Sequence, residues 1–105
     1  MSVQKVNDTE FAEILSSKEK VVVKYYADWC GSCRLIAPKY NRMSEEEKNQ
    51  EFTFLEVNAE ESPEARKLAG VSNLPFFAIF KNGQLQQADF TAKPETVESM
   101  IDSLR

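Results

Sequence analysis

The residues of this 105-residue chain whose type and spacing could do chemistry are its two cysteines, Cys30 and Cys33, separated by Gly31 and Ser32. A C-x-x-C pair at the junction of a strand and a helix suits dithiol–disulfide chemistry, because one helical turn brings both sulfurs within bonding range. The first sulfur then lies at the helix N-terminus, where unpaired backbone N–H groups and the positive end of the helix dipole favour thiolate over thiol. This placement predicts a redox protein.

The absence of histidine removes several other kinds of site. Neither a Ser-His nor a Cys-His nucleophile pair can form, and no metal site can contain histidine. A structural zinc site needs four ligands and this chain offers two thiols, so zinc would have to bridge two copies of the chain. We expect no bound metal or other cofactor, and a monomer in solution.

Composition and charge narrow the class of protein further. With 42% hydrophobic and 29% charged residues, the chain has the composition of one soluble globular domain spanning residues 1–105. The formal net charge of −4 argues against nucleic acid and anionic membranes as partners, because both require a basic patch. We find neither a signal peptide nor a run long enough to span a membrane, and therefore expect a cytoplasmic protein. In that reducing compartment a C-x-x-C pair is more typical of catalysis or metal binding than of a structural disulfide.

A strand and a helix are predicted on either side of the cysteine pair. Residues 21–27 form a continuous apolar run rich in β-branched and aromatic side chains, which is typical of a strand buried on both faces. Residues 31–48 predict a helix, which Pro38 should kink because proline lacks an N–H group and crowds the preceding turn. The side chains expected on the buried side of this helix are Leu35, Ile36, Tyr40 and Met43.

The remaining patterns complete an alternating order of strands and helices. Strands are predicted over residues 3–6, 52–57, 76–80 and 85–90, the last two joined by the two-residue turn Asn82-Gly83. Helices are predicted after Asn7-Asp8-Thr9, from Ser62-Pro63-Glu64 to Gly70, and from Pro94-Glu95. The order βαβαβαββα predicts an α/β fold in which a central mixed five-stranded sheet is flanked by four helices, with helices on both faces.

Four segments resemble the thioredoxin family in order and spacing, and together they extend over essentially the whole chain. They are Ala27-Asp28-Trp29-Cys30-Gly31, Ile36-Ala37-Pro38, Leu74-Pro75 and Phe80-Lys81-Asn82-Gly83. The resemblance implies the thioredoxin fold, a redox-active disulfide between Cys30 and Cys33, and an oxidoreductase that reduces disulfides of other proteins through a mixed disulfide. It also implies a recycling partner, a thioredoxin reductase-like enzyme that uses NADPH. The chain itself has no dinucleotide motif and would bind no nucleotide.

The resemblance implies a role for each matched residue. Cys30 would be the exposed nucleophile that attacks a substrate disulfide, and Cys33 would resolve the resulting mixed disulfide. Leu74-Pro75 matches the family's cis-proline, which lies beside the sulfurs and offers its backbone to an extended substrate; a proline that merely begins a strand is the alternative. Trp29 would shield one side of the dithiol; its other role is ordinary packing, and the two roles are compatible.

The chain departs from the family first at Ser32, where thioredoxins usually carry proline. Serine restores a backbone N–H group near the Cys30 thiolate, next to Gly31, and adds a hydroxyl group. Additional donors stabilise the thiolate and hence the reduced form, which predicts a reduction potential less negative than the roughly −270 mV typical of thioredoxin. The alternative is that serine is simply tolerated at this position.

A second departure is Lys24, which occupies the position of the family's buried aspartate, six residues before the first cysteine. A buried, unpaired ammonium group is costly, but Glu56 interrupts the neighbouring buried strand at the site of the lysine that accompanies that aspartate. The simplest account is a charge-reversed pair of Lys24 and Glu56; a partly exposed Lys24 that reaches water along its stem is the alternative. The family's aspartate helps to deprotonate the resolving thiol, so here either Glu56 would take that part or Lys24 would favour the thiolate directly.

The third departure is Thr91, near a glycine that lets substrates approach closely in the family. Phe90-Thr91-Ala92 should therefore build a bulkier rim and, together with Phe76 after Pro75, alter the choice of partner. Three functions remain open here: the protein-disulfide reductase, a more oxidising oxidase or isomerase-like relative, and a binding module with incidental cysteines. The intact Trp29-Cys30-Gly31-Ser32-Cys33 argues against the binding module, because a non-catalytic module has no need of both thiols.

Overall fold

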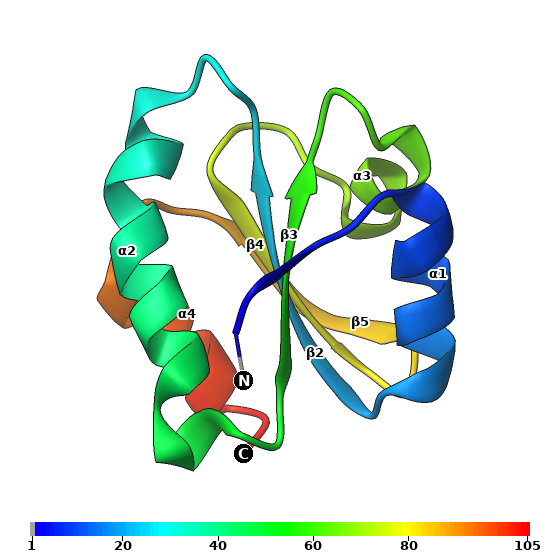
Figure 1. Ribbon diagram of the computed structural model, residues 1–105, viewed down its shortest axis with the longest axis vertical. Coiled ribbons are helices and arrows are strands. Elements are labelled where there is room, and N and C mark those ends of the chain that lie inside the picture. Colours follow the sequence, from blue (N-terminus) through cyan, green and yellow to red (C-terminus); the bar gives the residue numbers. More distant parts are fainter. Residues whose placement is uncertain (1) are drawn as a thin grey trace.

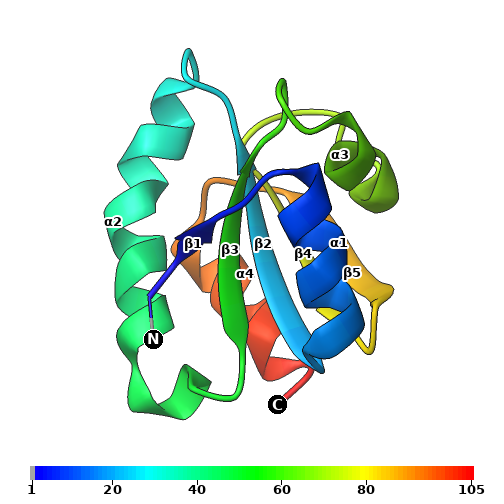
Figure 2. The same cartoon turned by 45° about the vertical axis from the view of Figure 1, so that its right-hand side comes forward.

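The computed structural model describes residues 2–105, so only residue 1 of the predicted domain lies outside the described part. Its strands are β1 (Gln4–Lys5), β2 (Lys20–Tyr26), β3 (Thr53–Asn58), β4 (Phe76–Lys81) and β5 (Gln84–Phe90). They form one mixed five-stranded sheet (Figure 1) in the order β1-β3-β2-β4-β5, with all five strands labelled in Figure 2. The first three of these run parallel, whereas β4 is antiparallel to β2 and β5 is antiparallel to β4.

Helices cover both faces of this sheet. They are α1 (Asp8–Ser17), α2 (Gly31–Glu45), α3 (Pro63–Ala69) and α4 (Pro94–Asp102), with a short 3-10 helix, η1 (Glu47–Asn49), after α2. The helices α1 and α3 pack on one face, and α2 and α4 on the other (Figure 1 and Figure 2). The predicted order βαβαβαββα, with its mixed sheet and flanking helices, is confirmed. Among residues 2–105, no helix has both the length and the apolar character needed to cross a bilayer.

The central strands are buried on both faces because they separate two apolar clusters. On the α1 and α3 side, the rings of Phe11 and Phe80 meet edge to face with 5.7 Å between their centroids. On the α2 and α4 side, the strands pack around the fully buried Tyr40. Alternate residues of a strand point to opposite faces, so Val22 and Lys24 of β2 both face α2.

Tyr40 joins the helix that begins at the cysteines to the two central strands. Its hydroxyl group donates to the carbonyl oxygens of Val22 at 3.1 Å and Leu55 at 2.8 Å. Its ring centroid lies 5.4 Å from those of Phe54 and Phe77. Burial raises the pKa of Tyr40 well above its usual range, so the hydroxyl group keeps its proton and remains a donor. These contacts hold α2 against β2 and β3.

Capping and turn residues set the ends of the elements as predicted. Asn7 caps α1: its Oδ1 accepts from the Glu10 amide at 2.9 Å, while the Glu10 carboxylate accepts from the Asn7 amide at 3.0 Å. Gly70 ends α3 in the left-handed region, with φ of 67°. Asn82 and Gly83, with φ of 52° and 81°, form the two-residue turn between β4 and β5.

Two details of α2 differ from the prediction. Leu35 is 80% exposed rather than on the buried side with Ile36 and Met43. Successive helical residues are turned by about 100° around the helix axis. Leu35 therefore lies outside the buried stripe of Ile36, Tyr40 and Met43, which follow one another at spacings of four and three residues. The helix continues through Pro38 but does not reach residue 48, because residues 47–49 form η1 instead.

Candidate active site

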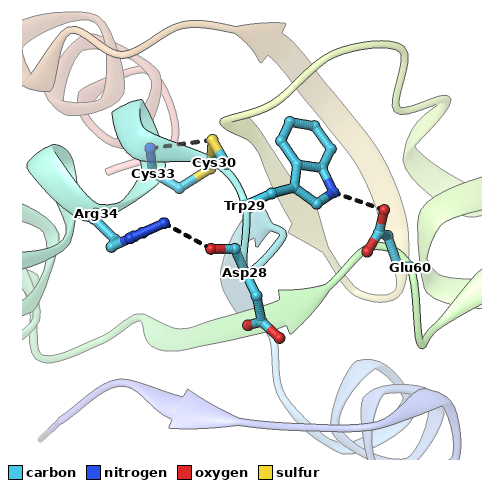
Figure 3. The surroundings of a disulfide bond; sticks show 6 residues. All are labelled: Asp28, Trp29, Cys30, Cys33, Arg34 and Glu60. Atoms are coloured by element: carbon cyan, nitrogen blue, oxygen red, sulfur yellow. Dashed lines mark hydrogen bonds between the residues drawn. A yellow bond between two sulfur atoms is a disulfide. The ribbon is translucent and has the colours of Figure 1, made fainter.

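Cys30 and Cys33 form a disulfide at the N-terminus of α2 (Figure 3). Their Cα atoms are 5.3 Å apart. Cys30 is the N-cap residue of the helix, and its Sγ accepts a hydrogen bond from the backbone N–H group of Cys33 at 3.2 Å. The unpaired N–H groups of the first turn and the positive end of the helix dipole therefore act on this sulfur. This position stabilises a negative charge on Cys30 when the disulfide is reduced.

Both cysteines are nearly buried, with 5% of Cys30 and 3% of Cys33 exposed. The prediction that Cys30 is exposed is therefore wrong for the disulfide-bonded state. Each sulfur covers part of the other, which removes surface that a free thiol presents to solvent. The exposed fraction of Cys30 is larger than that of Cys33, but only by a small margin.

Trp29 and Glu60 lie beside the disulfide, as Figure 3 shows. Trp29 is 66% exposed, and its indole Nε1 donates a hydrogen bond to Oε2 of Glu60 at 2.7 Å. The ring is thus held on the surface next to Cys30, which excludes core packing as its role. On the other side of this loop, the guanidinium group of Arg34 donates to the carbonyl oxygen of Asp28 at 2.8 Å.

The loop before β4 carries the predicted cis-proline. The Leu74–Pro75 peptide bond is cis, and Pro75 is buried. The N–H group of Thr91 donates to the carbonyl oxygen of Pro75 at 3.2 Å, and Thr91 Oγ1 accepts from the Lys93 amide at 3.0 Å. Thr91 and Pro75 therefore belong to one rim, while the half-buried Leu74 packs against the apolar cluster on the α1 and α3 side.

Phe76 does not contribute to this rim, contrary to the prediction. It is buried and packs edge to face against Tyr25, with 6.2 Å between ring centroids. Phe76 is the first residue of β4, and the alternation of the strand turns its ring into the core beneath α1 and α3. Of the residues expected to alter the choice of partner, Phe76 therefore lies in the core, whereas Thr91 lies at the rim.

Lys24 and Glu56 form the predicted charge-reversed pair. They are partners in the register of β2 and β3, and Nζ of Lys24 lies 3.4 Å from Oε2 of Glu56. The Lys24 side chain is 4% exposed, so the alternative in which it reaches water is wrong. Its Nζ also lies 5.5 Å from the ring centroid of Tyr40 and 5.7 Å from that of Tyr26. A carboxylate and two aromatic faces thus offset the cost of burying the ammonium group.

The charged pair and the second cysteine line the same cavity, which has a volume of about 220 Å³. Its walls are formed by Lys24, Tyr26, Ala27, Asp28, Cys33, Arg34, Ala37 and Glu56. Burial lowers the pKa of Lys24 below its ordinary value, and the Glu56 carboxylate offsets part of that shift. The cavity is large enough to admit water, because one molecule needs only about 15 Å³.

Gly31 and Ser32, the residues between the cysteines, are exposed. In this disulfide-bonded state the hydrogen bond to Cys30 Sγ comes from the Cys33 amide. The predicted contribution of the Ser32 amide concerns the Cys30 thiolate of the reduced protein and stays a prediction. A Cβ atom added to Gly31 would meet no atom within 4 Å. The turn between the cysteines is therefore open to an approaching partner.

Known proteins similar to this chain define its family. The family model described as Thioredoxin matches residues 2–104. The chain belongs to the thioredoxin family. It is 35% identical over 100 residues to Thioredoxin-1 of Schizosaccharomyces pombe, over 94% of this chain and 95% of that protein.

Solved structures of the thioredoxin family share the fold. A Plasmodium falciparum thioredoxin superposes with a TM-score of 0.88 at 28% identity, over 97% of this chain and 99% of that one. A chain in the complex of ferredoxin:thioredoxin reductase and thioredoxin f2 superposes with a TM-score of 0.89 at 30% identity, over 99% of this chain and 96% of that one. The thioredoxin fold implied by the sequence motifs is therefore confirmed.

As a member of the thioredoxin family with a disulfide-bonded C-x-x-C pair, the protein is a thiol–disulfide oxidoreductase. In such an exchange a thiolate attacks a disulfide sulfur, and a new S–S bond forms as the old one breaks. Cys30 and Cys33 together can donate or accept two electrons. Nowhere in residues 2–105 do three or more Cys, Asp, Glu or His side chains gather in a way that could hold a metal ion.

Sequence reasoning missed two residues of this thioredoxin-family site, Glu60 and Arg34. Glu60 is 31 residues from Trp29 along the chain, and the neighbouring Glu61 offers the indole N–H group the same chemistry. Arg34 donates to the backbone oxygen of Asp28, and because every residue carries such an oxygen, the sequence does not indicate which one Arg34 contacts. The need of an indole N–H group for an acceptor is the one signal that points toward Glu60.

Proposed function

We propose that this thioredoxin-family protein reduces disulfides in other proteins, with Cys30 as the attacking thiol and Cys33 as the resolving thiol. The observation that carries this assignment is the N-cap position of Cys30, whose Sγ accepts the Cys33 amide at 3.2 Å. It supports Cys30 as the thiolate, because the helix N-terminus acts on this sulfur and Cys33 lies one turn deeper. The marginally greater exposure of Cys30 supports the same order of attack.

The reaction consists of two exchanges. The Cys30 thiolate attacks one sulfur of the substrate disulfide and forms a mixed disulfide, while the other substrate sulfur leaves as a thiolate. Cys33, once deprotonated, attacks Cys30 Sγ, which forms the Cys30–Cys33 disulfide and releases the second substrate sulfur. The substrate gains two electrons and the dithiol loses two.

Substrate binding is assigned to Trp29, Leu74, Pro75 and Thr91. Trp29 offers an exposed aromatic surface next to Cys30, held in place by Glu60. The backbone of Leu74 and Pro75 would lie along an extended substrate segment, with Thr91 as the neighbouring wall of the rim. Gly31 and Ser32 leave the approach to the sulfurs open.

The Lys24–Glu56 pair supports the second exchange, because Cys33 must lose its proton before it attacks. Both residues line the cavity that Cys33 also lines. Glu56 takes the proton and, with 28% of its side chain exposed, can pass it to solvent; Lys24 holds the carboxylate and favours the Cys33 thiolate through its charge. Lys24→Met should raise the pKa of the Cys33 thiol in the reduced protein, measured by the ultraviolet absorbance of the thiolate. If the thiol titration is unchanged, Lys24 and Glu56 serve only to stabilise the fold.

Recycling is assigned to a thioredoxin reductase-like enzyme that draws on NADPH, with this chain acting as a monomer in the cytoplasm. The complex of ferredoxin:thioredoxin reductase and thioredoxin f2, which contains a chain similar to this one, supports a reductase as partner. A dithiol that reduces other proteins must itself be kept reduced, which supports a reducing compartment. NADPH would bind to the reductase and not to this chain.

The test is the reduction of a disulfide-bonded protein by catalytic amounts of this chain with NADPH and a thioredoxin reductase, read as NADPH consumption. The wild type should turn over and Cys30→Ser should not. Cys33→Ser is the matched variant: its Cys30 can attack but nothing resolves the product, so a stable mixed disulfide should appear as a mass shift. Capture of the substrate by Cys33 in Cys30→Ser, with none by Cys33→Ser, would reverse the assignment.

A further inference from the structure

The exposed side of α2 is basic although the chain as a whole is acidic. The helix carries three basic residues and one acidic residue, Glu45, at its last position, whereas the net charge of the chain is −4. Lys39 and Arg42 on this helix are exposed, and so is Lys93 in the loop after β5. Pro94, next to Lys93, lines the same surface hollow as Lys39 and Arg42. The three cations therefore lie on one side of the molecule, and we call Lys39, Arg42 and Lys93 the basic strip.

The basic strip keeps its charge available for a partner. In the part of the chain that the structure describes, none of its three side chains forms an ion pair. Two carboxylates, those of Glu46 and Glu98, line the hollow beside the strip. Glu98 is already paired with Lys48 at 3.7 Å, and the Glu46 carboxylate accepts from Asn49 at 3.4 Å.

The basic strip begins within reach of any protein that engages Cys30. At about 1.5 Å per helical residue, Lys39 lies about 13 Å and Arg42 about 18 Å along α2 from Cys30. A standard protein interface covers about 800 Å² on each partner, which is a disc of about 16 Å radius. An interface centred on Cys30 would thus include Lys39 and end near Arg42. Lys93 follows Thr91 by two residues and contacts it through its backbone, whose amide donates to Oγ1 of Thr91, while its side chain is exposed beside the rim.

The opposite border of the disulfide is acidic. Asp28 after β2, and Glu60 and Glu61 after β3, are all exposed. Figure 3 shows Glu60 beside Trp29 and Asp28 between Trp29 and Arg34, so the guanidinium group of Arg34 offsets part of the negative charge at this border. An acidic patch on a substrate would be repelled from this border and attracted to the basic strip. The two borders together select the charge of a partner and its orientation.

We propose that protein substrates with an acidic patch beside their disulfide dock on the basic strip, so that Lys39, Arg42 and Lys93 decide which disulfides are reduced fastest. This inference rests on the proposed reductase function. Charges at the rim of an interface act mainly on the rate of encounter, so their effect belongs in the second-order rate constant and weakens with salt. The exposed side chain of Leu35, between the cysteines and Lys39 on α2, adds apolar surface to the same contact.

Two synthetic peptides that share one intramolecular disulfide test the proposal. One continues into a run of glutamates, the other into a run of lysines of equal length, and a third with a glycine-serine run serves as the neutral reference. The measurement is the second-order rate constant with which each peptide oxidises the reduced chain. Trp29, the single tryptophan of the chain, reports the oxidation by its fluorescence. No reductase is needed, so recycling does not enter the result.

The wild type should react about 5- to 10-fold faster with the acidic than with the basic peptide at low salt. The ratio should fall below about 2-fold in 1 M salt, where the Debye length is about 3 Å. Charge reversal of the basic strip, Lys39→Glu with Arg42→Glu and Lys93→Glu, should abolish or invert the preference. The neutral peptide should react equally with both proteins, which shows that the variant retains its active site.

The matched control reverses three exposed cations elsewhere, Lys18→Glu with Arg66→Glu and Lys67→Glu. Lys18 directly follows α1, and the other two lie in α3, the two helices that pack on the opposite face of the sheet. It carries the same change in net charge and should keep the preference for the acidic peptide. A preference that is missing in the wild type, retained in the strip variant or lost equally in the control would overturn the docking inference. Failure of all three peptides to oxidise the reduced wild type would instead contradict the proposed function.

Discussion

Nζ of Lys24 lies 3.4 Å from Oε2 of Glu56, across neighbouring parallel strands and beside the cavity that Cys33 lines. The two partners differ in exposure, because the Lys24 side chain is almost wholly buried and the Glu56 side chain is 28% exposed. A charge left alone at Lys24 would lack both its partner and water, whereas one left at Glu56 would keep contact with solvent. Removing the two partners should therefore have unequal effects.

Glu56→Gln should destabilise the folded protein more than Lys24→Met. Loss of one partner from a buried pair costs about 3–5 kcal/mol, and the partial exposure of Glu56 places the expected loss near about 2 kcal/mol. Lys24→Met removes the buried charge itself at similar volume, so we expect a change below about 1 kcal/mol. Urea unfolding of the oxidised proteins gives both free energies. Equal losses would mean that the neighbouring tyrosine rings, and not the carboxylate, offset the burial of Lys24.

The same pair should make stability depend on pH in the alkaline range. Burial lowers the pKa of Lys24 below its ordinary 10.5 in the folded protein, so between the lowered value and 10.5 the unfolded chain binds more protons. Stability rises with pH wherever the unfolded state binds more protons. The difference in unfolding free energy between wild type and Lys24→Met should therefore shift in favour of the wild type as pH approaches 10.5.

Taking this difference also cancels the opposite contribution of Tyr25 and Tyr40, whose pKa values burial raises. Unfolding curves of the two proteins at a series of alkaline pH values provide the measurement. A difference that does not change with pH would contradict a lowered pKa of Lys24.

Ser32 should make the protein a weaker reductant than a thioredoxin with proline at this position. It lies in the first turn of α2, where its N–H group has no partner within the helix and can turn to the thiolate on reduction. We expect a reduction potential less negative than roughly −270 mV in the wild type and a more negative value in Ser32→Pro. Ser32→Ala keeps the N–H group and should resemble the wild type. Equilibration with glutathione buffers, read by Trp29 fluorescence, measures all three; a wild-type potential at or below that reference would refute the prediction.

Asp8 should contribute to stability by capping a helix other than its own. Its Oδ1 and Oδ2 accept from the amides of Ala65 at 2.9 Å and Glu64 at 3.1 Å, in the first turn of α3. Asp8→Ala should cost about 1–2 kcal/mol of unfolding free energy and leave the rate of thiol–disulfide exchange unchanged. Asp8→Asn retains an acceptor oxygen and should lose less. If urea unfolding shows equal losses for both variants, the charge of Asp8 and not its hydrogen bonds is responsible.

Features that depend on local chemistry could be predicted from the sequence. The C-x-x-C pair specifies its own disulfide and its place at a helix N-terminus, and Asn82-Gly83 specifies a tight turn. The Lys24–Glu56 pair was predictable for a different reason: each charge interrupts an otherwise apolar strand, and a buried charge needs a partner. Because Lys24 and Glu56 interrupt neighbouring strands and carry opposite charges, the simplest arrangement pairs them with each other.

Features that depend on long-range placement could not be predicted in this way. Asp8 contacts α3 across 56 and 57 residues, and nothing in either segment indicates the other. The exposure of Leu35 is a different case, because it follows from local helix geometry: Leu35 is turned by about 100° from its neighbour Ile36, out of the stripe of Ile36, Tyr40 and Met43. The burial of Cys30 and of Phe76 depends on which side chains pack against them in the fold, and the spacing of residues along the sequence does not indicate those neighbours.

The hydroxyl group of Tyr40, ten residues after Cys30, donates hydrogen bonds to main-chain oxygens of β2 and β3. A sliding or tilting motion of the helix would break these bonds in a region closed to water. We therefore expect electron transfer to rearrange only the short turn between the thiols, while the scaffold behind it stays rigid. Successive partners, whether they deliver electrons or take them away, would then meet the same docking platform.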